Sequence, residues 1–179
     1  MSSMTDSKIL VAPREIKDQV EKASRVLLCE ASVADRLAED ITFCEIHYGQ
    51  GISSWLEIAD ADSKTLSKTL KNSLELRLPT GCESADVHFD PPIPFALLAR
   101  SLHIQENNGI RWSCATEVTS GNSAIDSVHL KFDASLSPLP NQKITDAFST
   151  GLKISLRECN QLNEIASQFL LSEELLDQS

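Results

Sequence analysis

The amino-acid sequence predicts an α+β fold, in which a helical N-terminal half packs with a small, mainly antiparallel sheet and a C-terminal helix. Apolar residues recur three and four positions apart in the first half of the chain, which is the spacing of amphipathic helices. In the second half, apolar and polar residues alternate in stretches bounded by turn residues, as in half-buried strands. This change of period separates a mainly helical part, residues 9–78, from sheet plus helices, residues 85–172.

One domain is the simplest arrangement for a chain of this length. Its 179 residues suffice for one sizeable hydrophobic core, whereas two domains would each be small. With 41% hydrophobic and 23% charged residues, the composition is that of an ordinary globular protein. Residues 1–8 are expected to form a flexible tail before this domain. No internal repeat is expected.

Two long helices are expected at the start of the chain. The first runs from about Pro13 to Cys29, because proline is tolerated in a first helical turn and apolar residues follow at helical spacing. The second begins with Ser32 and Asp35, which resemble a capping box, and ends near His47. Gly49 is placed to terminate it.

Shorter elements follow as far as the break at residues 79–84. A third helix is expected at Ser53–Ala59, and a further amphipathic stretch begins with Ser63 as its cap. Three lysines alternate with leucines in residues 63–71. We interpret them as the solvated face of a helix, although an anion site is the alternative.

The second half is expected to hold four strands and two helices. A short strand around Val87 and Phe89 is expected to end at the prolines of residues 90–94, because proline cannot donate to a strand ladder. The remaining expectations, in chain order, are a helix over 94–102, a hairpin of strands 110–118 and 128–132 joined by a turn at 119–122, a loop at 137–141, a third strand at 152–156 and a helix over 162–169.

Charge and cysteine content restrict the class of function. The formal net charge of -10 disfavours nucleic-acid and anionic-lipid partners, since the basic residues are scattered. No apolar run approaches the length that crosses a bilayer, so we expect no membrane contact. The five cysteines are odd in number and far apart, unlike a secreted disulfide framework. A reducing compartment, and therefore a cytoplasmic location, is expected.

The common cofactor and metal motifs are missing. The chain contains neither a phosphate-binding glycine loop, nor a dinucleotide fingerprint, nor a hydrolase nucleophile elbow. Cys44 and His47 have half the spacing of a zinc site, but no second pair completes it. Cys44 also lies on the apolar stripe of its helix, where a free cysteine acts as a small hydrophobe. We expect no cofactor and no metal.

The segment Glu45–Trp55 holds the densest group of polar, titratable and glycine residues. His47 is the candidate acid/base there, although a histidine at a helix C-terminus is also favoured by the helix dipole. The residues expected to assist it are an orienting carboxylate, Glu45 or Asp40, and a polar contact, Tyr48 or Gln50. The candidate ligand-binding residues are Trp55 and Trp112.

Residues 15–58 resemble the N-terminal helices of the malate/L-lactate dehydrogenase family, where two helices lead to a Ser-His-Gly-Val turn followed by an arginine. On that pattern, Gln50 stands in the place of the acid/base histidine and Ser54 stands near the place of the arginine. Both functional residues are therefore replaced, and the remaining chain is too short for that family's cofactor domain. The resemblance implies a retained helical scaffold without dehydrogenase chemistry.

A second resemblance covers more of the chain. It rests on the helix Pro94-Phe-Ala-Leu-Leu-Ala-Arg100, which leads into a Gly-Ile-Arg-Trp112 strand, and on a closing Leu-Asn-Glu-Ile-Ala166 helix. This order is similar to that of an uncharacterised family of proteobacterial proteins, a domain of unknown function. The resemblance implies a fold and no activity.

Two functional hypotheses follow. The first is a non-catalytic binding or accessory protein of bacterial metabolism, whose partner is another protein, a second copy of itself, or a small metabolite between the helical half and the sheet. The second is a small cytoplasmic enzyme that acts on a metabolite with His47 as acid/base. The absence of a complete catalytic constellation favours the first.

Overall fold

The computed structural model describes residues 7–27, 29–74, 76–138 and 140–176, but not the side chains of Ser63 and of residues 170–176. It confirms the α+β fold. In chain order the elements are β1 (Lys8–Val11), α1 (Pro13–Val26), α2 (Ala31–His47), α3 (Gly51–Ala59), α4 (Ser63–Ser73), β2 (Ser84–Pro94), the 3₁₀ helix η1 (Phe95–Leu97), α5 (Ala99–Asn107), β3 (Ile110–Cys114), β4 (Ala124–Phe132), α6 (Gln142–Thr150), β5 (Leu152–Ser155) and α7 (Leu156–Leu176).

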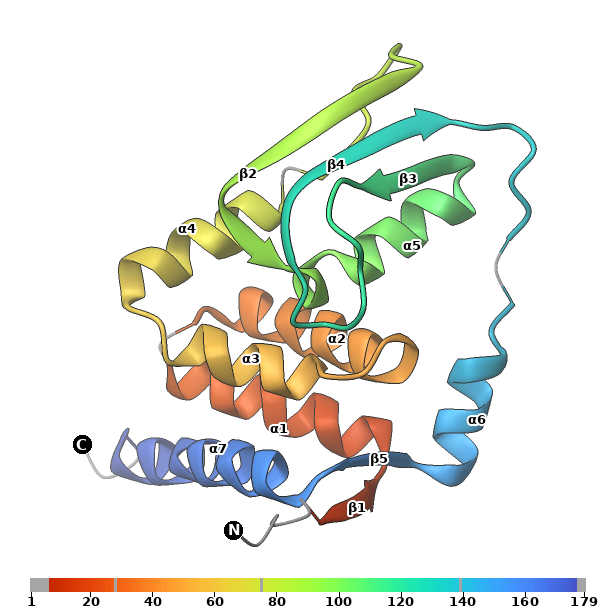
Figure 1. The fold of residues 1–179 in the computed structure, drawn as a ribbon. Helices are drawn as coiled ribbons and strands as arrows, with labels where there is room; N and C mark the ends of the chain where they lie inside the picture. Colours follow the sequence, from red (N-terminus) through yellow and green to blue (C-terminus); the bar gives the residue numbers. More distant parts are fainter. Residues whose placement is uncertain (1–6, 28, 75, 139, 177–179) are drawn as a thin grey trace, which may run out of the picture.

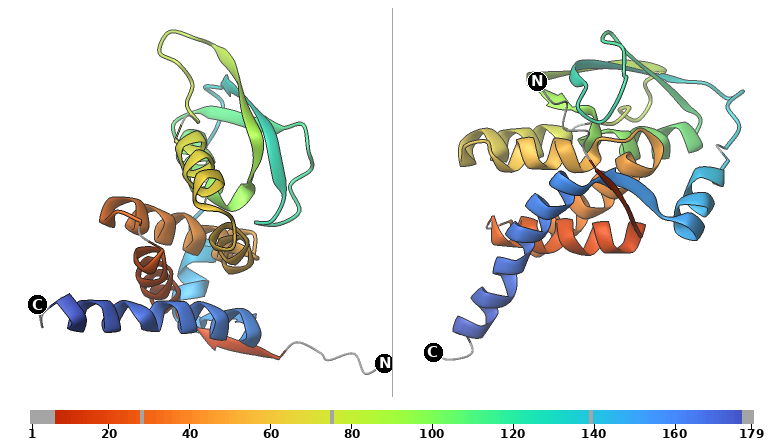
Figure 2. Two further views of the ribbon diagram at one scale, coloured as in Figure 1. Left: turned by 90° about the vertical axis from the view of Figure 1, so that its left-hand side faces the viewer. Right: turned by 60° about the horizontal axis from the view of Figure 1, so that its bottom comes forward.

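The strands form two separate antiparallel sheets (Figure 1). The three-stranded sheet, in the order β2-β4-β3, lies at one end of the molecule above α4 and α5. Helices α1, α2 and α3 occupy the middle, and the β1-β5 ribbon with α7 lies at the opposite end (Figures 1 and 2). The helical half therefore stands between the two sheets.

The loop between the first two helices differs from its expected form. Helix α1 ends at Val26 rather than at Cys29. Helix α2 begins at Ala31, which places Ser32 inside the first turn instead of at the capping position, and no side-chain hydrogen bond caps this helix. The end of α2 at His47 agrees with the prediction. Gly49, which follows the C-cap residue Tyr48, has the positive φ of a helix terminator.

Helix α4 is capped one residue earlier than the sequence suggests. The N-cap is Asp62, whose carboxylate accepts hydrogen bonds from the amides of Lys64 and Thr65, each at 3.0 Å, and Ser63 is the first helical residue. Asp and Ser are comparable as caps, so composition alone does not decide between two adjacent candidates. Helix α3 likewise begins at Gly51, two residues before its expected start.

The prolines of residues 91–94 do not end strand β2, contrary to expectation. The strand continues to Pro94 and resumes its pairing with β4 at Ile93, after a register shift that begins at His88. Two conditions make this acceptable. β2 is an edge strand, so one side of it needs no donors, and the irregular register accommodates the residues that cannot pair.

The helix expected over residues 94–102 is divided into η1 and α5 at Leu98. The amides of Phe95 and Ala96 donate to the carbonyls of Ser123 and Gly121, at 2.9 and 3.0 Å. These bonds tie the start of the segment to the loop before β4. A tertiary contact therefore sets its conformation, which local periodicity does not reveal.

The expected hairpin of β3 and β4 is present, with Cys114 opposite Val128. Strand β3 is shorter than predicted, because it ends before Thr116 and Val118. Strand β5 lies close to its predicted place, but it is not a third strand of this sheet. Helix α6, which precedes it, was not expected.

Strand β5 pairs instead with β1, an element that the sequence did not suggest. Ile9 lies opposite Ile154, and the Ser7 carbonyl accepts a hydrogen bond from the Leu156 amide at 2.8 Å. Lys8 therefore belongs to a strand rather than to the expected tail, whose residues 1–6 lie outside the described part. The first described strand is thus joined to the segment that leads into the last helix.

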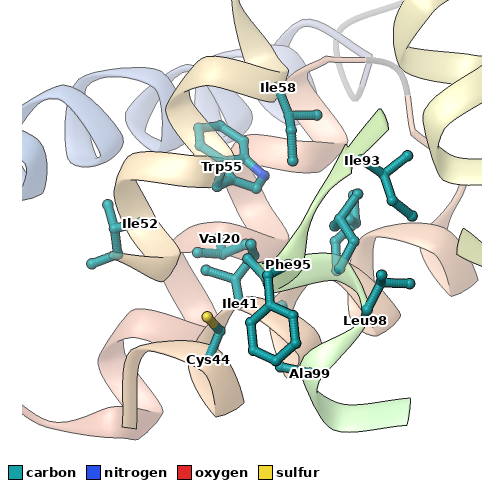
Figure 3. Close-up of a cluster of buried hydrophobic side chains, with 14 of the residues drawn as sticks. Val20, Ile41, Cys44, Ile52, Trp55, Ile58, Ile93, Phe95, Leu98 and Ala99 are labelled. Carbon is teal, nitrogen blue, oxygen red and sulfur yellow. The ribbon is translucent and has the colours of Figure 1, made fainter. Parts of the chain in front are cut away.

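One hydrophobic cluster connects the helical half with the three-stranded sheet (Figure 3). Trp55 from α3 and Phe95 from η1 are at most 2% exposed, and Ile93 from β2 is fully buried. The same cluster includes Val20 of α1 and Ile41 of α2. The two halves therefore share one core.

Candidate functional site

His47 lies in an aromatic cluster at the C-terminal end of α2. Its ring stacks on Phe43, with 4.2 Å between ring centroids, and lies 5.7 Å from the ring of His103. Its Nε2 atom is buried and has no hydrogen-bond partner among the described residues. Burial, together with the nearby His103 and Lys143, lowers the pKa of His47, which favours a neutral imidazole.

The carboxylates expected to orient His47 bind elsewhere. Glu45 accepts a hydrogen bond from the amide of Ile52 at 3.0 Å, so it caps the N-terminus of α3. Burial raises the pKa of Glu45, against the opposing effect of these backbone amides. Asp40 is 2% exposed and accepts a hydrogen bond from Arg100 at 2.7 Å. Both carboxylates hold helices together.

Tyr48 and Gln50 follow His47 on the outer surface. The Tyr48 ring meets Phe95 edge to face, with 4.9 Å between centroids, and the residue is 39% exposed. Gln50 is exposed and precedes α3 in the left-handed conformation, with a φ of 57°. This backbone conformation is uncommon for a residue other than glycine. It turns the chain sharply from α2 into α3.

The two tryptophans have different surroundings. Trp55 is a core residue, whose indole Nε1 donates to the Ser24 hydroxyl at 3.0 Å. A buried tryptophan commonly satisfies its N–H in this way, and the contact ties α3 to α1. Trp112 is half-buried on β3, where its ring lies 5.8 Å from that of Phe95. The two candidate ligand contacts therefore have different partners, although both pack in the same cluster.

The turn at Gly49–Gly51 receives the loop that precedes β4. The Gly121 amide donates to the Gly49 carbonyl at 3.1 Å. A Cβ atom on Gly121 would lie 2.8 Å from the Cys44 sulfur and 2.9 Å from the Gln50 carbonyl oxygen. Only glycine fits this approach without a shift of the backbone.

Asn122 completes the same contact with side-chain hydrogen bonds. Its Oδ1 accepts from the Ser54 hydroxyl at 2.7 Å, and its Nδ2 donates to the Ser53 hydroxyl at 3.1 Å and to Glu57 at 3.0 Å. The segment Glu45–Trp55 is therefore a joint between the helical half and the sheet. The sequence marks residues 119–122 only as a turn, because no local pattern identifies the helix that a turn contacts.

A groove with a volume of 640 Å³ lies between α3 and α7, away from His47. We call it the acidic groove. Its carboxylates are Glu57, Asp60, Glu158 and Glu164, and Arg157 is the one basic residue among those that line it. The half-buried apolar side chains that line it include Leu27, Leu56 and Ile165. It combines negative charge with an apolar surface.

A second groove, of 480 Å³, lies between α2 and α4. Its lining is mainly apolar and includes Leu74, which is 63% exposed. Arg36 stands at this groove, but its guanidinium donates to the Ser73 hydroxyl at 3.0 Å. His47 lines neither of the two grooves.

Comparison with protein-family models, curated proteins and solved structures finds no match. The two resemblances seen in the sequence therefore stay predictions. Within the described ranges, no three histidine, cysteine, aspartate or glutamate residues gather as metal ligands would. No described helix is both long and apolar enough to cross a membrane.

Proposed function

We propose that this protein is a non-catalytic accessory protein that binds a basic, amphipathic helical segment of a partner protein in the acidic groove. The observation that carries the proposal is the composition of this groove, which has four carboxylates, one arginine and an apolar surface. A helix with leucines on one face and lysines on its flanks is complementary to both properties. The net charge of -10 favours the approach of a basic partner.

The size of the groove suits this kind of ligand. Its 640 Å³ falls in the range of sites that bind small ligands and short segments. It lies between two helices, which is the usual setting for helix-in-groove recognition. We further propose a reducing, cytoplasmic location, supported by five cysteines that are all free.

The enzyme hypothesis has less support. His47 lies outside both grooves, and its expected carboxylate partners bind backbone amides or arginine instead. A cysteine nucleophile on the same helix is also disfavoured, because burial raises the pKa of Cys44 to about 12. Binding is therefore the function that the geometry supports best.

The test uses a synthetic helical peptide of leucine and lysine, with a leucine and glutamate peptide of the same length as control. We expect calorimetry to show binding of the basic peptide only. The variant Asp60→Lys/Glu164→Lys should weaken binding about fivefold to thirtyfold, because each reversed charge costs on the order of 0.5–1 kcal/mol. Glu21→Lys on α1, which does not line the groove, should leave the affinity unchanged.

Two results would overturn the proposal. One is equal affinity for the acidic and basic peptides. The other is binding of a small free diamine at the groove, lost in Asp60→Lys/Glu164→Lys, without any binding of the basic peptide. That second result would assign the groove to a cationic metabolite.

A further inference from the structure

The two ends of the chain carry the same sequence pattern. When residues 9–28 are aligned with residues 152–171, a separation of 143 positions, seven of the twenty pairs are identical. The identical pairs are Arg14 and Arg157, Glu15 and Glu158, Glu21 and Glu164, Ala23 and Ala166, Ser24 and Ser167, Leu27 and Leu170, and Leu28 and Leu171. Both segments read as a short strand followed by a helix.

The strand pairing follows the same correspondence. In the β1-β5 ribbon, Leu10 lies opposite Lys153. A two-fold axis through this pair exchanges residue 9 with residue 152 and residue 11 with residue 154, which are the aligned positions. The pairs Ile9–Ile154 and Val11–Leu152 are then related to each other by the axis. An antiparallel ribbon permits several such axes, and the alignment selects this one.

The helices agree as well. α1 begins at Pro13 and α7 begins at Leu156, again 143 positions apart. The two helices pack against each other, and Figure 2 shows that they cross at an angle. The aligned residues Ile16 and Cys159 are both buried and line the same small cavity. Sequence identity, strand register and helix position therefore all agree with the same alignment, in which the two segments are 143 residues apart.

The copies differ where their neighbours differ. Val20 of α1 is fully buried in the main core, whereas the aligned Asn163 of α7 is half-buried. Helix α2 packs extensively on α1, whereas among the described elements α7 packs mainly on α1, α3 and β5. Burial beneath α2 explains why position 20 is the apolar Val20. Asn163 has no such cover from α2, which explains why a polar residue is tolerated there.

We propose that β1-α1 and β5-α7 are two copies of one strand–helix unit, and that their contact is a subunit-type interface which a second copy of this chain can occupy by exchanging its α6-β5-α7 arm. A two-fold interface between like units is the form that homodimers use. The nine residues 133–141 join this arm to β4, and a fully extended segment of that length spans about 30 Å, which permits exchange. The inference replaces the expectation of a chain without repeats and does not depend on the acidic groove.

The experiment uses full-length chains in which the exposed Cys82 is changed to serine. One chain carries Leu10→Cys and the other carries Lys153→Cys. Both positions are exposed, and they are direct neighbours in the ribbon. The two chains are unfolded together, refolded as an equimolar mixture at high concentration, and treated with a short bismaleimide. We expect a cross-linked dimer whose joined peptides contain positions 10 and 153.

The control mixture replaces the second chain by Lys131→Cys, an exposed position on β4, and should lose this cross-link. The double variant Leu10→Cys/Lys153→Cys, refolded at low concentration, should form the link within one chain. The proposal would be overturned by the following combination of results. The double variant forms the link within one chain, but the mixture of Leu10→Cys and Lys153→Cys chains gives no more cross-linked dimer than the Lys131→Cys control mixture. Because all substitutions lie at exposed positions, that result cannot be ascribed to failed folding.

Discussion

At the scale of single residues, Glu45 shows how a candidate site residue acquires a structural role. Its position next to His47 in sequence suggested an orienting carboxylate, but residues one and two positions apart on a helix point in different directions. The side chain instead reaches the first amides of α3, which it caps. Its neighbour in space is the next helix, which the sequence does not specify.

The pH dependence of stability tests this role of Glu45. Burial raises the pKa of Glu45 in the folded state, so folding favours the protonated acid. Its stabilising contribution is then present below the pKa of the unfolded chain, near 4.3, and is lost as the pH rises through the folded-state pKa. Glu45→Gln keeps an acceptor for the Ile52 amide and removes the titration. We expect wild type to lose stability relative to Glu45→Gln as the pH rises above about 4.3.

Urea unfolding at several pH values measures this difference. Glu45→Ala serves as the control, because it removes the acceptor as well as the charge and should be less stable than Glu45→Gln at every pH. A constant difference between wild type and Glu45→Gln across this range would show that the carboxylate is not desolvated as described.

At the scale of elements, the sequence located most helices and strands but misplaced several of their ends. Pro13 and His47 bound their helices as expected, because proline and the glycine after Tyr48 act locally. The passage of β2 through its prolines depends on its edge position, which is a property of the sheet. Helix α6 was missed, although Ile144, Ala147 and Phe148 have helical spacing, because its nine residues repeat that pattern too few times to indicate a helix.

Substitutions at Asp62 and Ser63 test which of these two adjacent residues caps α4. Asp62→Ala removes the acceptor of two backbone amides and should destabilise α4 by about 1 kcal/mol. Ser63→Ala at the first helical position should cost less than about 0.5 kcal/mol. Hydrogen exchange of the α4 amides, together with urea unfolding, measures both. A larger effect for Ser63→Ala would contradict the observed cap.

At the scale of the whole molecule, the joint at Glu45–Trp55 makes one core from two halves of different periodicity. Trp55 belongs to the helical half and Trp112 to the sheet, yet both belong to the same set of packed residues. Asn122 and Gly121 add polar and close backbone contacts at this joint. A shared core of this kind favours all-or-none unfolding.

Cooperativity provides the test at this scale. In Trp112→Phe the fluorescence reports Trp55 alone, and the far-ultraviolet circular dichroism of the same variant reports the whole chain. We expect fluorescence and circular dichroism of Trp112→Phe to show one urea midpoint. The free energy of unfolding should differ from that of wild type by less than about 1.5 kcal/mol for an aromatic exchange. Separate midpoints would mean that the helical half and the sheet unfold independently.

The sequence by itself determined the α+β class, most of the elements and the β3-β4 hairpin, because these depend on periodicity and on turn residues that act over a few positions. Only the tertiary structure decided three features. They are the role of Glu45–Trp55 as a joint, the pair of helices that forms the acidic groove, and the pairing of β1 with β5. These features join residues that are distant in sequence. Their partners are chosen by packing and hydrogen bonding in space, to which local patterns contribute no information.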